Sequence, residues 1–252
     1  MDTISKAYAK EIAALKLKKY RQKNQKFIVE GPNLVTEAQK QNKYSIECIV
    51  GTEAYFEKEV AIASSFPRFL ASGKLMDRMS TLKTHYDCLA VLKMEDEPPF
   101  DFEKGAIYLD GIQDPGNLGT IMRSAEWFGI QQILTSEDTV DPFNNKSIQA
   151  SAGSIYRVQC FTGGKEILQE ASQRSIPVYG LAMEGTSVFE YPIETNSITI
   201  IGSEGNGIRE DIHELMDMPL HIPQSSTNQA ESLNAGISAA IFLSQWYQQK
   251  NR

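Results

Sequence analysis

The residues of this chain that are best suited to catalysis or ligand binding lie in three loops rich in glycine, asparagine and serine. The first loop, Asp114-Pro115-Gly116-Asn117, leads into a predicted helix that carries Arg123. Arginine keeps its positive charge and offers five N–H donors, which suits it to phosphate groups. The apolar positions of the helix predict that Arg123 projects away from the core. The same spacing fits a surface arginine with Asn117 as a helix cap, so both interpretations stay open.

The second loop follows an apolar strand and has the sequence Gly202-Ser203-Glu204-Gly205-Asn206-Gly207. Glycine lets a backbone turn sharply or pass close to a ligand. The spacing differs from the G-x-G-x-x-G fingerprint of dinucleotide-binding folds, and the loop lies in the last fifth of the chain. A Rossmann dinucleotide site is therefore disfavoured.

The third loop lies between a strand that ends at Ile222-Pro223 and a helix that begins near Leu233. Ser232 and Asn234 stand at the start of that helix, where serine and asparagine are favoured as N-caps. The helix then continues with mostly small residues over positions 235–240. Such a run permits close approach of another chain segment, either at a subunit contact or in an ordinary core.

Strands and helices must alternate to position these loops, and from residue 106 onward the sequence predicts that they do. We expect strands over residues 106–109, 132–134, 178–181, 198–201 and 219–222, and helices over 118–128, 165–173, 209–216 and 233–248. This alternation predicts an α/β fold with a mostly parallel sheet that is covered by helices on both faces. Ligands of such sheets bind at the carboxyl ends of strands, which is where the three loops lie.

The first part of the chain has its own pattern of elements. We expect an amphipathic helix over residues 4–20, helices over 33–41 and 74–79, and strands over 27–29, 46–50 and 88–92. The charged, proline-rich stretch EDEPPFDFEKG then follows. We therefore expect an N-terminal domain over residues 1–97, a linker over 98–104 and a second domain over 105–252.

Charge is distributed unevenly along this chain of net charge −7. The first 30 residues contain eight basic and three acidic side chains, a balance of +5, and the other 222 residues carry −12. Clustered lysines and arginines bind phosphates in a salt-dependent manner, which favours an RNA-binding arm. A solvated helix face explains the same residues equally well.

The composition excludes several other classes of protein. The chain of 252 residues is 41% hydrophobic and has no apolar run of membrane-spanning length and no signal peptide, so we expect a cytoplasmic protein without a membrane partner. Cys48, Cys88 and Cys160 lie far apart in apolar surroundings and are expected as buried thiols. The three histidines are scattered, and no metal site is expected.

In this order and spacing the three loops resemble the SpoU family of RNA ribose 2'-O-methyltransferases, within the SPOUT superfamily. The matching positions are Asn117-Leu118-Gly119 with Arg123, then Gly202-x-Glu204-Gly205-x-Gly207, then Ile222-Pro223 with Ser232-Leu233-Asn234. The resemblance covers residues 106–248. The sequence KYRQKNQKFIVEGPNLVTEA is similar to the small ribosomal-protein-like domain that binds RNA in ribosomal-RNA members of the family.

The resemblance implies a catalytic domain with a deep trefoil knot near its C-terminus, S-adenosylmethionine as the cofactor, no metal ion, and a homodimer formed through helices that include the last one. Main-chain groups of Gly202, Ile222 and Leu233 would hold the cofactor. Ser232 and Asn234 would shape the site at the start of the last helix.

The resemblance also assigns roles around the reacting hydroxyl group. Arg123 would activate the ribose 2'-hydroxyl, with Asn117 and Glu204 orienting Arg123 and the substrate. Because arginine resists deprotonation, we expect Arg123 first as a phosphate anchor. Positioning of the hydroxyl would then supply much of the rate.

Two segments depart from the family pattern. Asn145 stands where many members have proline, and Gln149 stands where many have a basic residue, which puts an RNA contact there in question. The loop over residues 224–231 lacks the glycine common in the family and is slightly longer, which alters the rim of the expected cofactor pocket.

The sequence therefore predicts a homodimeric, S-adenosylmethionine-dependent RNA 2'-O-methyltransferase. The N-terminal domain favours ribosomal RNA, with 23S rRNA first, over transfer RNA. A rival hypothesis is a catalytically silent RNA-binding or ribosome-assembly factor on the same fold. A nicotinamide-dependent oxidoreductase is a third, but it lacks the glycine fingerprint.

Overall fold

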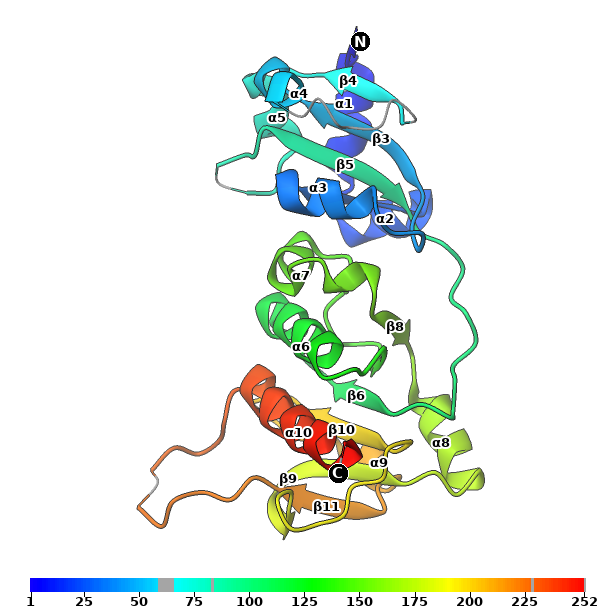
Figure 1. The fold of residues 1–252 in the computed structure, drawn as a ribbon, viewed down its shortest axis with the longest axis vertical. Coiled ribbons are helices and arrows are strands. Elements are labelled where there is room, and N and C mark those ends of the chain that lie inside the picture. Colours follow the sequence, from blue (N-terminus) through cyan, green and yellow to red (C-terminus); the bar gives the residue numbers. More distant parts are fainter. Residues whose placement is uncertain (59–65, 83, 228, 252) are drawn as a thin grey trace. The chain divides into compact units, whose positions relative to one another are not determined.

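The structure is a computed structural model that describes residues 1–58, 66–82, 84–227 and 229–251. The chain forms two compact units (Figure 1). Unit 1 comprises Met1–Asp96 together with Phe143–Tyr156, and unit 2 comprises Glu97–Pro142 together with Arg157–Arg252. Each unit has its own sheet and its own hydrophobic core.

Unit 1 is built on a mixed five-stranded sheet. The strands in spatial order are β1 (Asp2–Thr3), β4 (Arg68–Leu70), β3 (Ile46–Gly51), β5 (Cys88–Lys93) and β2 (Lys26–Glu30). β4 pairs in parallel with β1 and β3, whereas β5 runs antiparallel to β2 and β3. The structure confirms the three predicted strands, which are β2, β3 and β5. They were predictable because their apolar residues form continuous buried runs. The short strands β1 and β4 were not predicted.

Among the described residues of the first part of the chain, five helices accompany this sheet. They are α1 (Lys6–Ala14), α2 (Lys18–Asn24), α3 (Pro32–Ala38), α4 (Glu53–Lys58) and α5 (Gly73–Met79). The prediction of one helix over residues 4–20 is wrong, because the helix is interrupted between α1 and α2. Arg21 is 2% exposed and donates from Nη1 to the carbonyls of Leu15 and Lys16 at 2.9 Å each. These bonds satisfy the carbonyl groups at the break, so the chain can turn there.

Residues 143–156 belong to unit 1 although they lie far along the sequence. They form α7 (Asn145–Ser151) and the short 3-10 helix η1 (Ser154–Tyr156). Asn145 Nδ2 donates to the Glu30 carboxylate at 2.8 Å, and Gln149 Nε2 donates to the Glu30 carbonyl at 2.9 Å. Tyr156 Oη donates to the carbonyl of Leu34 at 2.9 Å. The two residues that depart from the family pattern thus both bind Glu30.

Unit 2 contains a six-stranded sheet whose strand pairs are all parallel. The strands in spatial order are β11 (Met218–His221), β9 (Val178–Ser187), β10 (Ile198–Gly202), β6 (Ala106–Asp110), β7 (Gln132–Thr135) and β8 (Gln159–Thr162). The predicted α/β architecture is confirmed. β8 was not predicted, because only Cys160 and Phe161 at its centre are apolar.

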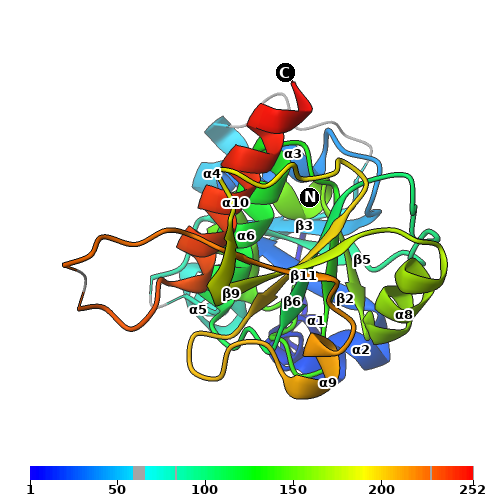
Figure 2. The same cartoon turned by 90° about the horizontal axis from the view of Figure 1, so that it is seen from below.

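The helices of unit 2 cover both faces of this sheet (Figure 2). α6 (Pro115–Trp127) and α10 (Ala235–Lys250) pack side by side, and α8 (Lys165–Gln173) and α9 (Glu210–His213) contribute to the core on the other face. α9 is shorter than predicted, and α10 begins two residues after the predicted start. As expected, α6 buries Leu118, Ile121, Met122 and Ala125 and leaves Arg123 exposed.

Two further observations concern the cysteines and the search for membrane-spanning helices. Cys48, Cys88 and Cys160 are buried free thiols, as predicted. Across the described ranges, we find no helix with the length and apolar character required to cross a bilayer.

Candidate active site

Glu204 brings the three glycine-, asparagine- and serine-rich loops together in unit 2. Its Oε1 atom accepts hydrogen bonds from Asn117 Nδ2 at 2.5 Å, from Asn234 Nδ2 at 2.8 Å and from the backbone N–H of Ala235 at 3.2 Å. Asn234 Nδ2 also donates to Asn117 Oδ1 at 3.0 Å. We call these three side chains, Asn117, Glu204 and Asn234, the Glu204 cluster. Residues up to 117 positions apart in the sequence thus meet at one carboxylate oxygen.

The start of α6 leaves Asn117 free for this role. Asp114 is the N-cap of α6, and its carboxylate accepts the backbone N–H of Asn117 at 2.9 Å. Pro115 follows at the first helical position, where its missing N–H has no cost. The interpretation of Asn117 as the helix cap is therefore wrong, and its side-chain amide faces Glu204 instead.

Asn234 combines a structural role with a place in the cluster. It is the N-cap of α10, and its Oδ1 atom accepts the N–H groups of Gly236 at 3.0 Å and Ile237 at 3.3 Å. Its Nδ2 atom is the donor to Glu204. The cap fixes the amide plane, so the N–H group is directed at the carboxylate without further ordering.

The glycine loop presents Glu204 at the tip of a closed turn. Ser203 and Gly207 exchange backbone hydrogen bonds of 3.1 and 2.9 Å, with Gly207 at φ +66°. A Cβ atom on Gly202 would lie 2.2 Å from the carbonyl carbon of Gly207. Glycine is therefore required at position 202 for the chain to return on itself.

Arg123 lies on α6 beyond Asn117, with its side chain exposed. Six residues on an α-helix correspond to about 240° of rotation, so Arg123 and Asn117 project from different faces. Within the residues that the structure describes, Arg123 has no hydrogen bond or ion pair, and Asn117 and Glu204 bind each other. The guanidinium is consequently available to an anionic group.

The remaining predicted residues lie along the chain from β11 to α10. Ser232 and Leu233 are exposed, the latter by 45%, and Ile222 is half-buried. In the described parts of the chain, the backbone groups of Ile222 and Leu233 and the hydroxyl of Ser232 have no hydrogen-bond partner. These groups can therefore bind a ligand without losing an existing bond.

Two residues that the sequence patterns did not single out, Asp110 and Arg209, lie at the same edge of the sheet as this cluster. Asp110 is the last residue of β6, and its buried carboxylate accepts the backbone N–H of Arg209 at 2.7 Å and its Nε–H at 2.8 Å. The hydrogen bond to Asp110 raises the pKa of Arg209 above its usual value. Burial raises the pKa of the neighbouring Tyr108 to about 12, so this phenol is neutral at physiological pH. An acid at the end of a buried strand was the signal in the sequence, because it requires a partner.

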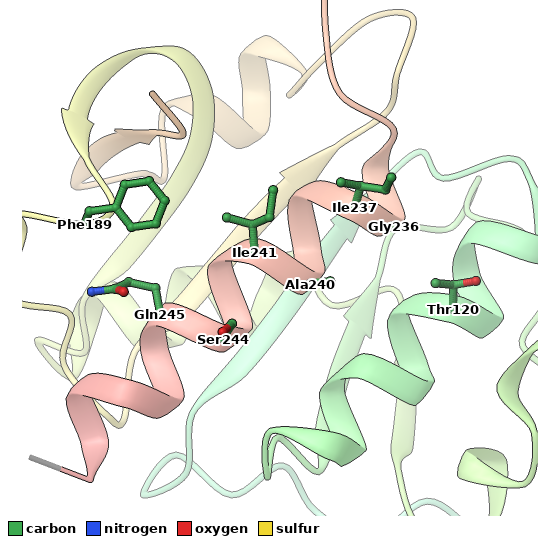
Figure 3. Close-up of a pocket in the computed structure, with 8 residues that line it drawn as sticks. All are labelled: Thr120, Phe189, Gly236, Ile237, Ala240, Ile241, Ser244 and Gln245. Carbon is green, nitrogen blue, oxygen red and sulfur yellow. The ribbon is translucent and has the colours of Figure 1, made fainter. Parts of the chain in front are cut away.

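An apolar groove of about 420 Å³ runs along the outer face of α10 (Figure 3). Its lining consists of Thr120, Phe189, Gly236, Ile237, Ala240, Ile241, Ser244 and Gln245. Phe189 and Ile237 are 53% and 52% exposed. Large apolar side chains with this exposure are typical of surfaces that contact another protein.

Comparison with protein families identifies both parts of the chain. The model of the SpoU rRNA Methylase family matches residues 104–244, and the model of the MRM3-like substrate binding domain matches residues 6–90. The 23S rRNA (guanosine(2553)-2'-O)-methyltransferase RlmP of Bacillus subtilis is 29% identical over 236 residues, which cover 93% of each chain. A 23S rRNA (guanosine-2'-O-)-methyltransferase RlmB of Neisseria meningitidis is 29% identical over 171 residues, 67% of this chain and 66% of that protein.

Solved structures share the whole architecture. A putative RNA methyltransferase of the TrmH family from Porphyromonas gingivalis is 34% identical, with a TM-score of 0.89 over 98% of this chain and 99% of that one. The SpoU methyltransferase AviRb from Streptomyces viridochromogenes, solved in complex with AdoMet, is 20% identical, with a TM-score of 0.87 over the same shares. At this lower identity the second likeness is one of fold.

Proposed function

Because the chain belongs to the SpoU rRNA methylase family, we propose that it transfers a methyl group from S-adenosylmethionine to a ribose 2'-hydroxyl in ribosomal RNA, with 23S rRNA as the favoured substrate. The observation that carries this proposal is the convergence of Asn117, Asn234 and the glycine loop on Glu204. This convergence joins all three loops at the carboxyl ends of the parallel strands, where α/β folds bind ligands. The relative from Bacillus subtilis, which covers nearly the whole chain, bears a name that specifies the same reaction on 23S rRNA.

The residues beside the Glu204 cluster fit the cofactor. Unpaired backbone groups at Ile222 and Leu233 offer donors and acceptors to an adenine edge, and the exposed Leu233 side chain offers an apolar surface. Within the described residues, Glu204 Oε2 has no partner and can accept a hydrogen bond from a ligand. S-adenosylmethionine, when bound, supplies a methyl group on a sulfonium centre that an oxygen nucleophile can attack.

Arg123 positions the RNA in this proposal. Its unpaired guanidinium binds a phosphate beside the target ribose and so places the 2'-oxygen for attack. In such a transfer the methyl group would exchange its bond to sulfur for one to the 2'-oxygen, and the hydroxyl proton would pass to water. Since a protonated guanidinium cannot accept that proton, we assign Arg123 to substrate binding and orientation.

Unit 1 supplies RNA affinity through its exposed lysines. Lys6, Lys10, Lys18, Lys19 and Lys23 are exposed, and none has an ion-pair partner in the described part of the chain. Lys16 and Arg21 differ, because Lys16 Nζ donates to the carbonyl of Arg78 at 2.8 Å and Arg21 is buried. We therefore assign RNA binding to the five lysines of this N-terminal segment that are exposed and have no hydrogen bond or ion pair among the described residues. We place the protein in the cytoplasm, in keeping with a ribosomal RNA substrate.

The groove on α10 supports a homodimer of unit 2. Its exposed Phe189 and Ile237 would be covered by a second copy of the chain, whose identical groove gives a two-fold symmetric contact. Ile237→Asp together with Ile241→Asp should produce monomers in sedimentation velocity experiments. Replacement of exposed Lys104 by Asp, outside the groove, is the matched control.

The path of the chain near its end supports the trefoil knot. β11 lies at the edge of the sheet, whereas the following helix α10 packs against α6 and β10. Residues 222–227 and 229–234 therefore belong to a connection that leads from the edge of the sheet back to α10. An experimental structure traced through this connection tests the crossing.

The experiment that tests the function uses radiolabelled S-adenosylmethionine, the wild-type protein and total RNA from a strain that lacks this gene. We expect label in 23S rRNA, mapped to one 2'-O-methyl nucleotide.

Arg123→Ala should abolish the transfer while calorimetry shows unchanged cofactor affinity. Cofactor binding without label in naked RNA, but with label in ribosomal particles, would identify an assembly intermediate as the substrate. A wild-type protein that binds no cofactor would instead be a silent RNA-binding factor.

A further inference from the structure

Arg209 connects the loops that follow three adjacent strands of unit 2. β10, β6 and β7 are neighbours in the sheet. Arg209 lies just beyond the glycine loop that follows β10, Asp110 ends β6, and Asp138 lies in the loop that follows β7. The Arg209 side chain, from the connection after β10, therefore binds the last residue of β6 and the loop after β7.

The bond between Arg209 and Asp110 is the strongest part of this arrangement. The Asp110 side chain is 0% exposed, and its Oδ1 atom accepts Nε–H at 2.8 Å and Nη2–H at 2.6 Å from Arg209. Its Oδ2 atom accepts the Arg209 backbone N–H at 2.7 Å. A buried carboxylate without these partners is strongly destabilising, so the three bonds are required together.

The outer contact of Arg209 is weaker and more exposed. Nη1 lies 3.4 Å from Asp138 Oδ1, and the Asp138 side chain is 52% exposed. Ion pairs of this kind contribute little free energy because water screens them. Asp138 therefore offers a control site on the same guanidinium.

The pair holds one end of two of the three loops that present the Glu204 cluster, those of Asn117 and Glu204. Gly111, at φ +69°, follows Asp110 directly and opens the loop to Asn117. The glycine loop with Glu204 ends at Gly207, two residues before Arg209. The cluster itself is largely exposed to water, so its own hydrogen bonds are weak restraints on the two loops.

We infer that the Arg209–Asp110 pair is a positioning pair, which sets the separation of the Asn117 and Glu204 loops and thereby the affinity for the cofactor. This inference rests on the proposed methyl-transfer function. Arg209 acts through the loops and has no assigned contact with the substrate. Loss of the pair would leave both loops intact in sequence but free to separate.

The test compares Arg209→Gln, Arg209→Lys and the control Asp138→Asn. Calorimetry measures S-adenosylmethionine affinity, and amide hydrogen exchange measures the protection of residues 111–117 and 203–208. For Arg209→Gln we expect affinity to fall about 10- to 100-fold, since charge-assisted hydrogen bonds are lost, and exchange to accelerate in these two segments. Arg209→Lys, which retains the charge, should recover part of both losses. Asp138→Asn should stay within about twofold of wild type.

Three results would overturn the positioning role. These are unchanged exchange and affinity in Arg209→Gln, an equal acceleration of exchange throughout unit 2, or an Asp138→Asn variant as impaired as Arg209→Gln. If Arg209→Gln fails to fold, Arg209→Lys and Asp138→Asn give the same comparison. The exchange measurement needs no cofactor, so it still tests the pair if the wild-type protein binds none and the proposed function fails.

Discussion

Glu30 in unit 1 and Glu204 in unit 2 are held by the same kinds of group but in opposite surroundings. Glu30 is 2% exposed, and its carboxylate accepts hydrogen bonds from Ser80 Oγ, from the N–H and Oγ1 of Thr81 and from Asn145 Nδ2, at 2.5 to 2.9 Å. Glu204 is exposed and accepts from two asparagine side chains and one backbone N–H. Both join segments that are distant in the sequence.

The two carboxylates differ in whether an oxygen atom remains accessible and without a hydrogen-bond donor. Four donors occupy both oxygens of Glu30, and the residue is buried, so a ligand cannot reach this carboxylate. All three donors to Glu204 share Oε1, and Oε2 has no partner among the described residues. Burial and full occupancy indicate a structural carboxylate, whereas exposure and a spare oxygen indicate one that faces a ligand.

The largest effect is expected from Glu30→Gln. The amide NH2 group of the substituted side chain would face N–H and O–H donors instead of accepting from them. These buried donors would also lose their ionised acceptor. We expect the free energy of unfolding to fall by about 2 to 4 kcal/mol. Urea denaturation followed by circular dichroism measures it, with Glu204→Gln as the matched control, for which we expect a change below about 0.5 kcal/mol. Equal losses in the two variants would remove the distinction between the two carboxylates.

Glu204→Gln should instead impair the reaction. The loss of the negative charge weakens the bonds from Asn117 and Asn234, so the loops lose their common acceptor. We expect kcat/KM for methyl transfer to fall about 10- to 100-fold while stability is retained. Steady-state kinetics with the RNA that the labelling experiment identifies measures the effect. Full activity in this variant would exclude Glu204 from the working site.

A smaller effect is expected when the asparagine partner of each glutamate is truncated. Asn145→Ala removes a buried donor to Glu30, but Asn145 Oδ1 is itself buried without a partner among the described residues, which offsets part of the loss. We expect about 1 kcal/mol of destabilisation. Asn117→Ala should leave stability within about 0.5 kcal/mol and lower activity about 10-fold. Thermal denaturation and kinetics on both variants measure the two effects, and a reversed pattern would contradict the comparison.

The sequence predicts the parts of this comparison that have a local signal. The strands that precede the first two loops, β6 and β10, are buried on both faces and therefore appear as unbroken apolar runs. Glycines 202 and 207 mark a turn with a real steric requirement. The spacing of α6 correctly places Arg123 on the exposed face.

Other features depend on partners that are distant in the sequence. Asn145 and Gln149 bind Glu30 across 115 and 119 positions, and Asp110 binds Arg209 across 99, so no window of sequence contains both partners. The break between α1 and α2 is different, because Arg21 binds carbonyl groups only five and six residues away. There a side chain competes with the helix for backbone acceptors. A prediction from apolar periodicity does not take this competition into account.

The smallest effects should distinguish exposed lysines that have no hydrogen bond from Lys16, which is exposed and has one. Lys18→Ala together with Lys23→Ala removes two exposed charges, whereas Lys16→Ala removes a group that donates to the carbonyl of Arg78. If Lys18 and Lys23 each contact a phosphate, the slope of log affinity against log salt should fall by about 1.4 to 1.8. Filter binding of labelled RNA at several salt concentrations measures the slope. Lys16→Ala should leave it unchanged. A slope altered by Lys16→Ala but not by the double variant would place the RNA contact at Lys16 and exclude Lys18 and Lys23.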